Sequence, residues 1–560
     1  MAPDESSHRA EQAKAIIQTE LEGNDRMDQE RRSILQSALD LVGTLPPGRT
    51  SSPHTGLSSE LPPEDCRDMP ESITPPPELL YMLLQDPTTG SSLRWPDHLS
   101  QEALVTMISA LLGGKATGQR FYQYCVCVYV KALFYIYQLP RYHTDSVLNE
   151  QSLHSKRKYE ACAIRALKSL SLLEKPSLPF VQALISSALL MQYLGYMNQS
   201  WMINSFATRL IVALQYHQVS ELTPATKFDK QVRSCLYWCY YLDRTLSALL
   251  LRPLSLPELR VAPTDLIGEE TSLAHLPLIS ILLELAQVQG ELLQIQSESK
   301  SHHQILASQH DKLQEQLGRI HVRLEANRAS ASGLLCTDWI ALEFIHYSIM
   351  VDTLRSRLKY AFSPLVHREC VSYARKSLTA LQFLLKNIRT MPGFVDPYPS
   401  FLSWTVLLYP LSPFFVLFCN IIGEVDLEDY KLVQDINRSL SQFASSPSIA
   451  KLLTLLDPLH NLCTPLIQVR TRLSPRARVV NWYPAAAEPQ APPLPPDDHP
   501  VHGGEASWLQ DTPFDSDAPT SLPVAAAATV DEMPMTPDGL MWRLFNTQVS
   551  MEWLDPSLSF

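Results

Sequence analysis

Glycine is scarce in this sequence, with only 18 glycines among 560 residues, whereas proline is abundant at 43. Tight turns rich in glycine are typical of β-structure, so this scarcity favours helices. The prolines gather in two stretches of the chain, which marks those stretches as linkers outside the folded body. An apolar run is also missing from residues 1–23, which excludes a secretory signal segment there.

No C-x-x-C pair occurs among the 10 cysteines. Cys125 and Cys127 are too close together for a zinc knuckle, and Cys235 and Cys239 have no pair of histidines nearby. Most of the cysteines lie in apolar helical runs, which is typical of buried thiols in a reducing compartment and not of a disulfide framework. We therefore expect no metal site and no cofactor in this chain.

Signatures of enzymes are missing as well. The motifs G-x-S-x-G and H-E-x-x-H do not occur, and residues 113–118 (GGKATG) lack the spacing of a phosphate-binding loop. An all-α enzyme such as an isoprenoid cyclase would need acidic metal-binding clusters on its helices, and the sequence has none. We therefore predict that the chain is not an enzyme.

The net charge of −12 is of the wrong sign for a surface that grips DNA throughout. Any contact with DNA must then be local, or made by a module outside the printed residues. Basic clusters are few, and solvated helix ends explain them as well as signals for nuclear import do.

Helical periodicity dominates residues 97–473 and predicts an all-α fold, a bundle of antiparallel helices joined by short breaks. The expected helices are 120–138, 157–173, 179–196, 199–217, 228–251, 277–327, 333–359, 364–389, 401–422 (broken by proline), 426–444 and 447–470. The segment 120–138 is apolar almost all round, so we expect it to be a central buried helix.

The flanking regions differ in composition from this bundle. Residues 1–43 contain apolar positions at helical spacing and predict N-terminal helices of linker or coil type. Residues 44–96 are rich in proline and serine and predict a disordered linker. Residues 474–560 hold too little apolar surface to fold alone and predict a disordered acidic tail.

Two segments invite other interpretations. Residues 401–422 have the length of a membrane span, but Pro410 and Pro413 interrupt them and no basic flank anchors them, so we predict a broken buried helix and no membrane contact. Residues 282–324 carry heptad-like apolar spacing that hydrophilic positions interrupt. An inner helix pair of the bundle is the prediction, and a coiled-coil homodimer is the alternative.

The stretch 228–254 is the most informative part of the sequence. Its apolar stripe at helical spacing consists of Val232, Cys235, Leu236, Cys239, Leu242, Leu246, Leu249 and Leu250. Asp243 lies at the edge of the stripe and needs a partner, because unpaired burial of a charge is costly. Ser247 lies one turn on and can donate a hydrogen bond, and Arg252 or Arg209 can supply charge. The group is either a buried polar clamp between helices or the wall of an effector pocket.

The same stretch resembles the regulatory domain of fungal zinc-cluster transcription factors, the middle homology region of the xylanolytic-activator type. That family carries an arginine-rich start, paired aromatics, Asp-Arg, Ser and Gly-Arg-Pro in this order. The matching residues are Arg233, Tyr237-Trp238, Asp243-Arg244, Ser247 and Arg252-Pro253, with Leu251 in place of the glycine. Upstream, residues 207–217 resemble the family's helix that ends in Gly-Leu-His, with Gln215 and Tyr216 differing and His217 retained. The likeness covers about residues 100–470, and its part around 404–423 is weaker.

This resemblance implies a nuclear, pathway-specific regulator of transcription. The family docks a helix of a six-cysteine zinc cluster in the major groove of DNA. The first cysteine here is Cys66, so zinc and DNA contact are expected only if such a module precedes the printed residues. The alternative is a modulator that does not bind DNA itself and partners a zinc-cluster transcription factor.

The end of the tail alternates acidic and large apolar residues, which is typical of a segment that activates transcription by recruiting the transcription machinery. The candidate activation residues are Trp542, Leu544, Phe545, Trp553, Leu554 and Phe560. A plain solvated tail is the alternative interpretation.

Overall fold

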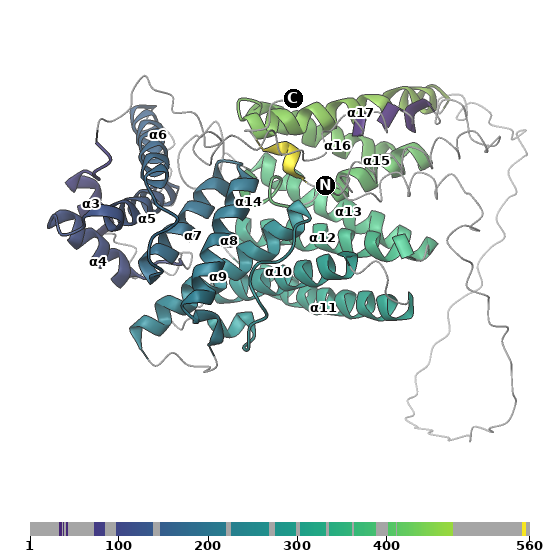
Figure 1. The fold of residues 1–560 in the computed structure, drawn as a ribbon. Coiled ribbons are helices and arrows are strands. Elements are labelled where there is room, and N and C mark those ends of the chain that lie inside the picture. The colour runs from purple at the N-terminus through teal and green to yellow at the C-terminus, as the bar shows by residue number, and fades with distance from the viewer. Residues whose placement is uncertain are drawn as a thin grey trace, which may run out of the picture. The chain divides into compact units, whose positions relative to one another are not determined.

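The structure is a computed structural model, and it describes only part of the chain. The described residues are 33–35, 37–38, 41–42, 72–84, 97–137, 146–219, 226–267, 275–297, 303–331, 335–360, 363–387, 401–409, 411–473 and 551–555. Within these ranges the regular elements are all helices, with no strand, which confirms the predicted all-α fold (Figure 1).

The helices largely follow the predicted periodicity. The first are α3 (Pro77–Leu84), α4 (Gln101–Leu112), α5 (Gly118–Ile136), α6 (Ser146–Lys168), α7 (Leu178–Tyr193), α8 (Met197–Ala213) and α9 (Lys227–Leu250). The later ones are α10 (Leu276–Ser297), α11 (His303–Ser330), α12 (Leu335–Tyr360), α13 (Pro364–Lys386), α14 (Phe401–Trp404), α15 (Ser412–Glu424), α16 (Leu427–Leu440) and α17 (Pro447–Leu473). Short 3-10 helices are η2 (Tyr216–Gln218), η3 (Pro263–Leu266), η5 (Ser441–Phe443) and η7 (Met551–Leu554).

The chain divides into two units. The first consists of residues 1–467 and 536–560 and contains nearly all of the helices. In the second, residues 468–535, the structure describes only 468–473, at the end of α17.

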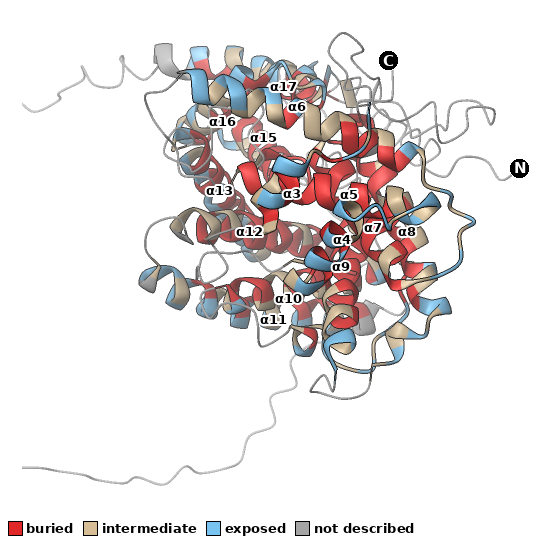
Figure 2. Cartoon of the chain, turned by 90° about the vertical axis from the view of Figure 1, so that its left-hand side faces the viewer, coloured by how far each residue is buried: buried red, intermediate tan, exposed pale blue. Residues whose placement is uncertain are grey.

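Consecutive helices pack against one another through most of the first unit. Contacts join α7 to α8, α8 to α9, α9 to α10, α10 to α11, α11 to α12 and α12 to α13. Helices that pack against their sequence neighbours after a short connection run antiparallel. The innermost helices, α5 and α7, are buried nearly all round, as the red ribbons in Figure 2 show. The prediction of a central buried helix at 120–138 is therefore confirmed.

The predicted helix at 277–327 is two helices, α10 and α11, which pack against each other. Their heptad-like positions, including Leu285, Leu313 and Ile320, are buried within this chain. Helix α10 is also long and apolar enough to cross a membrane by composition, but 61% of its apolar window is buried in the protein. Burial among α9, α11 and α12 explains its composition as that of a core helix.

The structure differs from prediction in the supposed linker. Residues 44–96 were expected to lack structure, but α3 lies within them and buries Leu79, Leu80 and Leu83 in the main core. The core also includes Ile34, Leu35 and Ala38 from the expected N-terminal helices, whose earlier part lies outside the described residues. Such a short amphipathic helix is missed in a proline-rich segment, because its few apolar positions do not form a recognisable helical period against the surrounding sequence.

Buried histidines lie at several helix contacts. His346 on α12 donates from Nε2 to the carbonyl oxygen of Leu317, 3.0 Å away, and its ring stacks on His321. Burial lowers the pKa of His346 to about 4. Burial also lowers the pKa of His310 on α11 and of His460 on α17.

These histidines predict that acid destabilises the domain. His346 stays neutral in the folded state down to about pH 4, whereas unfolded histidine takes up a proton below about pH 6.5, so at this residue the unfolded state binds more protons between pH 6.5 and 4. The lowered pKa values of His310 and His460 act in the same direction. The free energy of unfolding should therefore fall between pH 7 and 5, with His346 contributing up to about 2 kcal/mol. Denaturant titrations should show a smaller fall in His346→Gln and an unchanged fall in the control His154→Gln, whose side chain is exposed. An identical pH slope in His346→Gln and the unaltered chain would contradict this account.

Candidate functional site

Helix α9, which carries the family-like pattern, is defined at both ends. It begins with a capping box, in which Thr226 Oγ1 accepts from the Asp229 amide and the Asp229 carboxylate accepts from the Thr226 amide. It ends at Leu250, because Leu251 takes a left-handed conformation with φ 53°. The predicted apolar stripe from Val232 to Leu250 is buried throughout, as expected for the core side of the helix.

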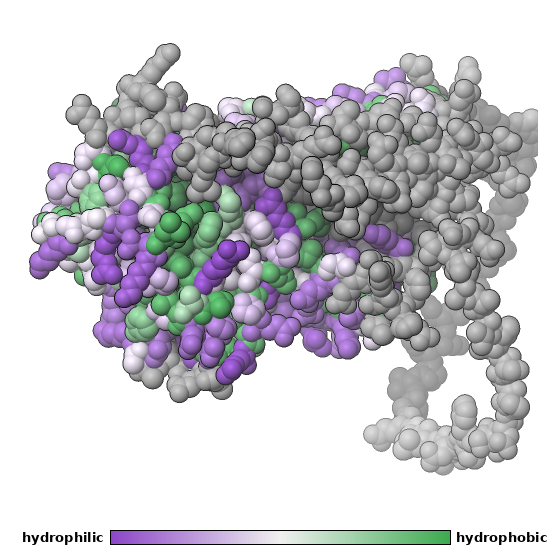
Figure 3. Space-filling view, in the orientation of Figure 1, coloured by the Kyte–Doolittle hydropathy of each residue, from purple (hydrophilic) through white to green (hydrophobic). Residues whose placement is uncertain are grey.

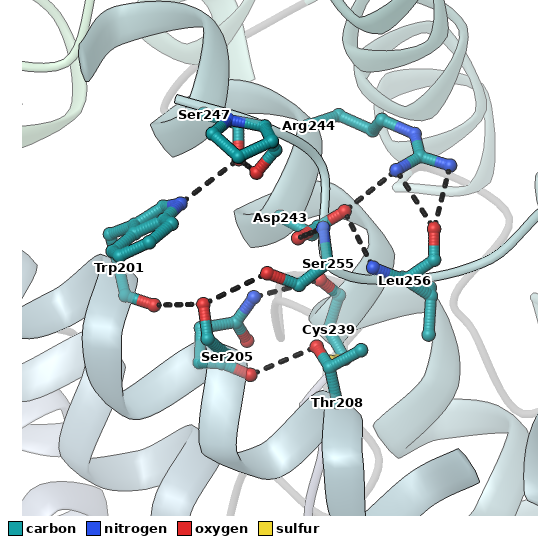
Figure 4. Close-up of polar contacts among 11 residues, drawn as sticks. Trp201, Ser205, Thr208, Cys239, Asp243, Arg244, Ser247, Ser255 and Leu256 are labelled. Atoms are coloured by element: carbon teal, nitrogen blue, oxygen red, sulfur yellow. Dashed lines mark hydrogen bonds and ion pairs between the residues drawn. The ribbon is translucent and has the colours of Figure 1, made fainter. Parts of the chain in front are cut away.

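Asp243 is the centre of a polar clamp, which we define as its contacts with Arg244, Ser255 and Leu256 (Figure 4). Its side chain is 1% exposed. Its Oδ2 lies 2.6 Å from Arg244 Nη1, and the carboxylate accepts from the amides of Ser255 (2.9 Å) and Leu256 (3.2 Å). Burial raises the pKa of Asp243, and the ion pair with Arg244 opposes that rise. The clamp folds the chain after α9 back onto the helix.

Arg244 completes the clamp from the other side. Both of its terminal nitrogens donate to the carbonyl oxygen of Leu256 at 3.3 Å, and its guanidinium lies 4.9 Å from the ring centre of Tyr240. Gly290 on α10 makes room for it, because a Cβ there would lie 2.6 Å from Arg244 Cδ. The expected charge partner of Asp243 was Arg252 or Arg209, and this expectation was wrong, since Arg244 fills that role.

A second layer of hydrogen bonds joins the clamp to α8. Trp201 Nε1 donates to Ser247 Oγ at 3.0 Å, and Ser247 Oγ donates to the Pro253 carbonyl at 3.3 Å. Ser205 and Ser255 share a hydrogen bond of 3.0 Å between their hydroxyls. Deeper in the contact, the Asn204 amide donates to the Cys239 carbonyl. Three stretches of chain, α8, α9 and 251–256, are thereby fixed together.

Arg252 connects the clamp to the start of α8. Its Nη2 donates to Asn198 Oδ1 at 2.8 Å, and its guanidinium lies 4.5 Å from the ring centre of Trp201. Because a cation over an indole face is attracted by the ring quadrupole, this stack fixes the Arg252 side chain.

The other predicted site residues lie elsewhere. Arg209 is exposed on α8, and His217 is half-buried in η2. Arg233 donates to the carbonyl oxygen of Asp265 in η3 at 3.2 Å. Trp238 packs edge-on against Tyr241 and Trp404. The structure therefore brings together Asp243, Arg244, Ser247, Arg252 and Pro253, but not Arg209, His217, Arg233 or Trp238.

The tail residues behave differently from the expectation of an open segment. Trp553 and Leu554 are buried in the core of the first unit. Trp542, Leu544, Phe545 and Phe560 lie outside the described residues. The prediction of a tail open to solvent is therefore wrong for residues 551–555.

A buried polar cluster around Asp97 was missed by sequence reasoning. Its carboxylate pairs with Lys131 on α5 and lies 2.8 Å from His98 Nδ1, while His98 Nε2 lies 2.7 Å from Ser186 Oγ on α7. Burial alone would raise the pKa of Asp97, but Lys131 and His98 outweigh it and hold that pKa well below its usual range. Lys131, in the middle of the largely apolar segment 120–138, was the available signal.

The cluster has the residue types of a serine hydrolase triad but the geometry of a structural network. Ser186 is 0% exposed, and its hydroxyl donates to Cys127 Sγ. A serine nucleophile must instead give its proton to the histidine and face a substrate. We therefore interpret the cluster as a buried junction between residues 97–98, α5 and α7.

The surface beside the clamp is largely apolar. The outer side of α8 carries the half-exposed Met202, Phe206 and Leu210 and the exposed Val212. Figure 3 shows green surface over α7 and α8 bordered by purple side chains. An apolar surface of this kind is typical of contact with protein and not with nucleic acid.

Other candidate sites are limited in the described part of the chain. An open groove of about 730 Å³ is lined by Ile34, Leu41, Pro458, Leu462 and their neighbours. No group of three or more metal-ligating side chains occurs among the described residues. No protein-family model matches the chain, and no curated protein sequence matches it either.

Gly290 offers a test of the clamp. An alanine at a helical glycine normally stabilises a protein by about 0.5–1 kcal/mol, and Gly318→Ala on α11, where the space is open, should do so. Gly290→Ala should instead lower the free energy of unfolding by about 1–3 kcal/mol, because the methyl group collides with Arg244. Chemical denaturation of both variants measures this difference. Equal stabilisation by the two substitutions would show that Arg244 does not lie against α10.

Lys131 offers a test of the Asp97 cluster. Lys131→Met should cost about 3 kcal/mol of unfolding free energy, because it leaves the Asp97 carboxylate without its main partner. The double variant Asp97→Asn with Lys131→Met should recover part of that loss, since no charge is then left unpaired. Additive losses in this double-mutant cycle would rule out a direct interaction.

Proposed function

We propose that this chain regulates transcription in the nucleus, with residues 97–473 as the regulatory domain of a fungal zinc-cluster type of transcription factor. In this proposal the helical domain integrates a pathway-specific signal, and the tail contacts the transcription machinery. The proposal gives the chain no catalytic role, and it is supported by the polar groups of the clamp and of the Asp97 cluster, which are engaged with one another.

One observation carries the proposal. The later part of the family pattern, from Asp243-Arg244 through Ser247 to Arg252-Pro253, takes part in one junction between α8, α9 and 251–256, whereas the earlier Arg233 and Trp238 contact other segments. This part of the pattern therefore forms one continuous hydrogen-bonded unit with the start of α8.

A second observation supports it from the backbone. Gln215 and Leu251 stand where the family pattern has glycine, and both have positive φ, 59° and 53°. The left-handed conformation costs an ordinary residue about 1–2 kcal/mol, and glycine avoids that cost. The backbone at both positions is thus of the kind that favours glycine, although the side chains differ.

The acidic charge of −12 argues that DNA contact belongs to a different module. The apolar surface over α8 and the aromatic residues of the tail suit protein partners. A second candidate is therefore a modulator that acts through a zinc-cluster partner. Sequencing of full-length transcripts distinguishes the two, because an upstream exon with the six-cysteine pattern would favour direct binding of DNA.

The proposed activation segment predicts a reporter result. The full chain, fused to an unrelated DNA-binding module, should activate a reporter gene. Replacing Trp542, Leu544 and Phe545 by alanine should reduce that activation severalfold, because these side chains would fill an apolar groove of the partner.

The tail provides a matched control of the same residue types. Alanine at Trp508, Leu509 and Phe514 removes equal apolar surface from the proline-rich part of the tail. These control substitutions should leave activation intact. An inactive fusion, or equal losses in the two triple variants, would refute the proposed function of the tail.

A further inference from the structure

Residues 551–555 are seated on the helical domain. The helix η7 packs against α9, and Met551, Trp553 and Leu554 belong to the main core. Figure 1 shows this segment in yellow among the helices of the bundle, far in sequence from its neighbours. Trp553 is 2% exposed and Asp555 1% exposed. Their burial indicates a specific docking site.

Asp555 is placed where α8 lacks a cap. The N-cap residue of α8, Tyr196, makes no capping hydrogen bond through its own side chain. Asp555 Oδ2 instead accepts from the amide of Asn198, in the first turn, at 3.4 Å. A carboxylate at a helix N-terminus is stabilised by the free amides and the helix dipole there. Lys451 on α17 donates to the Asp555 carbonyl oxygen from the other side.

The docking site also adjoins the clamp. Asn198, whose amide donates to Asp555, accepts through its own side chain from Arg252. Arg252 in turn stacks on Trp201, which donates to Ser247. A chain of contacts through Asn198 therefore joins the clamp to the docked segment.

The docked segment has a buried hydrogen-bond donor without a partner in the described part of the chain. Trp553 Nε1 is buried with no hydrogen-bond partner among the described residues. Docking removes the hydrogen bond from this N–H to water and puts no other in its place. Undocking restores that hydrogen bond, which lowers the net free energy of docking. This opposing contribution favours a contact that opens reversibly.

We propose that the start of α8, with Lys451 and Arg252 beside it, is a docking site for an acidic and aromatic segment, and that residues 551–555 of the same chain occupy it. While they are docked, Trp553 and Leu554 are unavailable to the transcription machinery. This inference rests on the proposed function of the tail, whereas the docking itself does not.

The docking can be measured in the full chain by fluorine NMR after labelling with 5-fluorotryptophan. The nine tryptophans give the signals, and Trp553→Phe assigns the one from Trp553. In the unaltered chain that signal should be insensitive to exchange of water for deuterated water. Lys451→Ala should lower the ratio of docked to undocked signal about tenfold. The control Lys386→Ala, at an exposed lysine on α13, should leave it unchanged.

Asp555 supplies an independent variant on the segment itself. Asp555→Ala should release the Trp553 signal, and Asp555→Asn should retain most of the docked signal, because an amide oxygen also caps a helix. A solvent-exposed Trp553 in the unaltered chain, or equal release in Lys386→Ala and Lys451→Ala, overturns the docking.

The reporter fusion then separates docking from function. Lys451→Ala leaves the tail sequence intact, so it should raise activation severalfold over Lys386→Ala if docking masks the segment. Release in the NMR spectrum without any rise in activation would overturn the masking and leave the docking standing. No activation by either fusion would count against the proposed function itself.

Discussion

A buried carboxylate must be surrounded by donors, and the arrangement of α8, α9 and residues 251–256 follows from satisfying Asp243. At 1% exposure its charge would be very costly without partners, and the clamp supplies Arg244 and the amides of Ser255 and Leu256. Those amides are available only if the chain reverses directly after α9. The left-handed Leu251 makes that reversal, and Gly290 on the neighbouring helix leaves space for the arginine.

Buried polar groups that need particular partners restrict the ways in which the helices of a bundle can pack. The apolar faces of α5, α7 and α9 are broad, and leucine-rich surfaces pack in several ways with similar energy. Asp243 at one junction pairs with Arg244 and the amides of residues 255–256, and Asp97 at another pairs with Lys131 and His98. Asn198 then joins the first junction to the docked segment at Asp555. The contacts at the start of α8, together with the packing of η7 against α9, thus link the clamp to residues 551–555.

Periodicity predicted most of the helices, because the spacing of apolar residues along an amphipathic helix is a local property of the sequence. It predicted α5 and the stripe of α9 within a few residues. It did not predict α3 inside the linker, nor the docking of Trp553, because both depend on surfaces provided by distant helices. For Asp243, a hydrogen bond from Ser247 and a charge from Arg252 or Arg209 were expected, whereas the adjacent Arg244 was not, since adjacent residues do not face each other on a helix. The long Arg244 side chain instead folds back over its own helix to reach the carboxylate.

The central claim is that the Asp243 carboxylate holds residues 255–256 through their amides. Amide hydrogen exchange, resolved by residue, measures this directly. If the clamp exists, the amides of Ser255 and Leu256 exchange as slowly as those in the middle of α9, although they lie outside any helix. Exchange as fast as that of an exposed loop would show that no such bond holds the chain there, and the account built on it would fail.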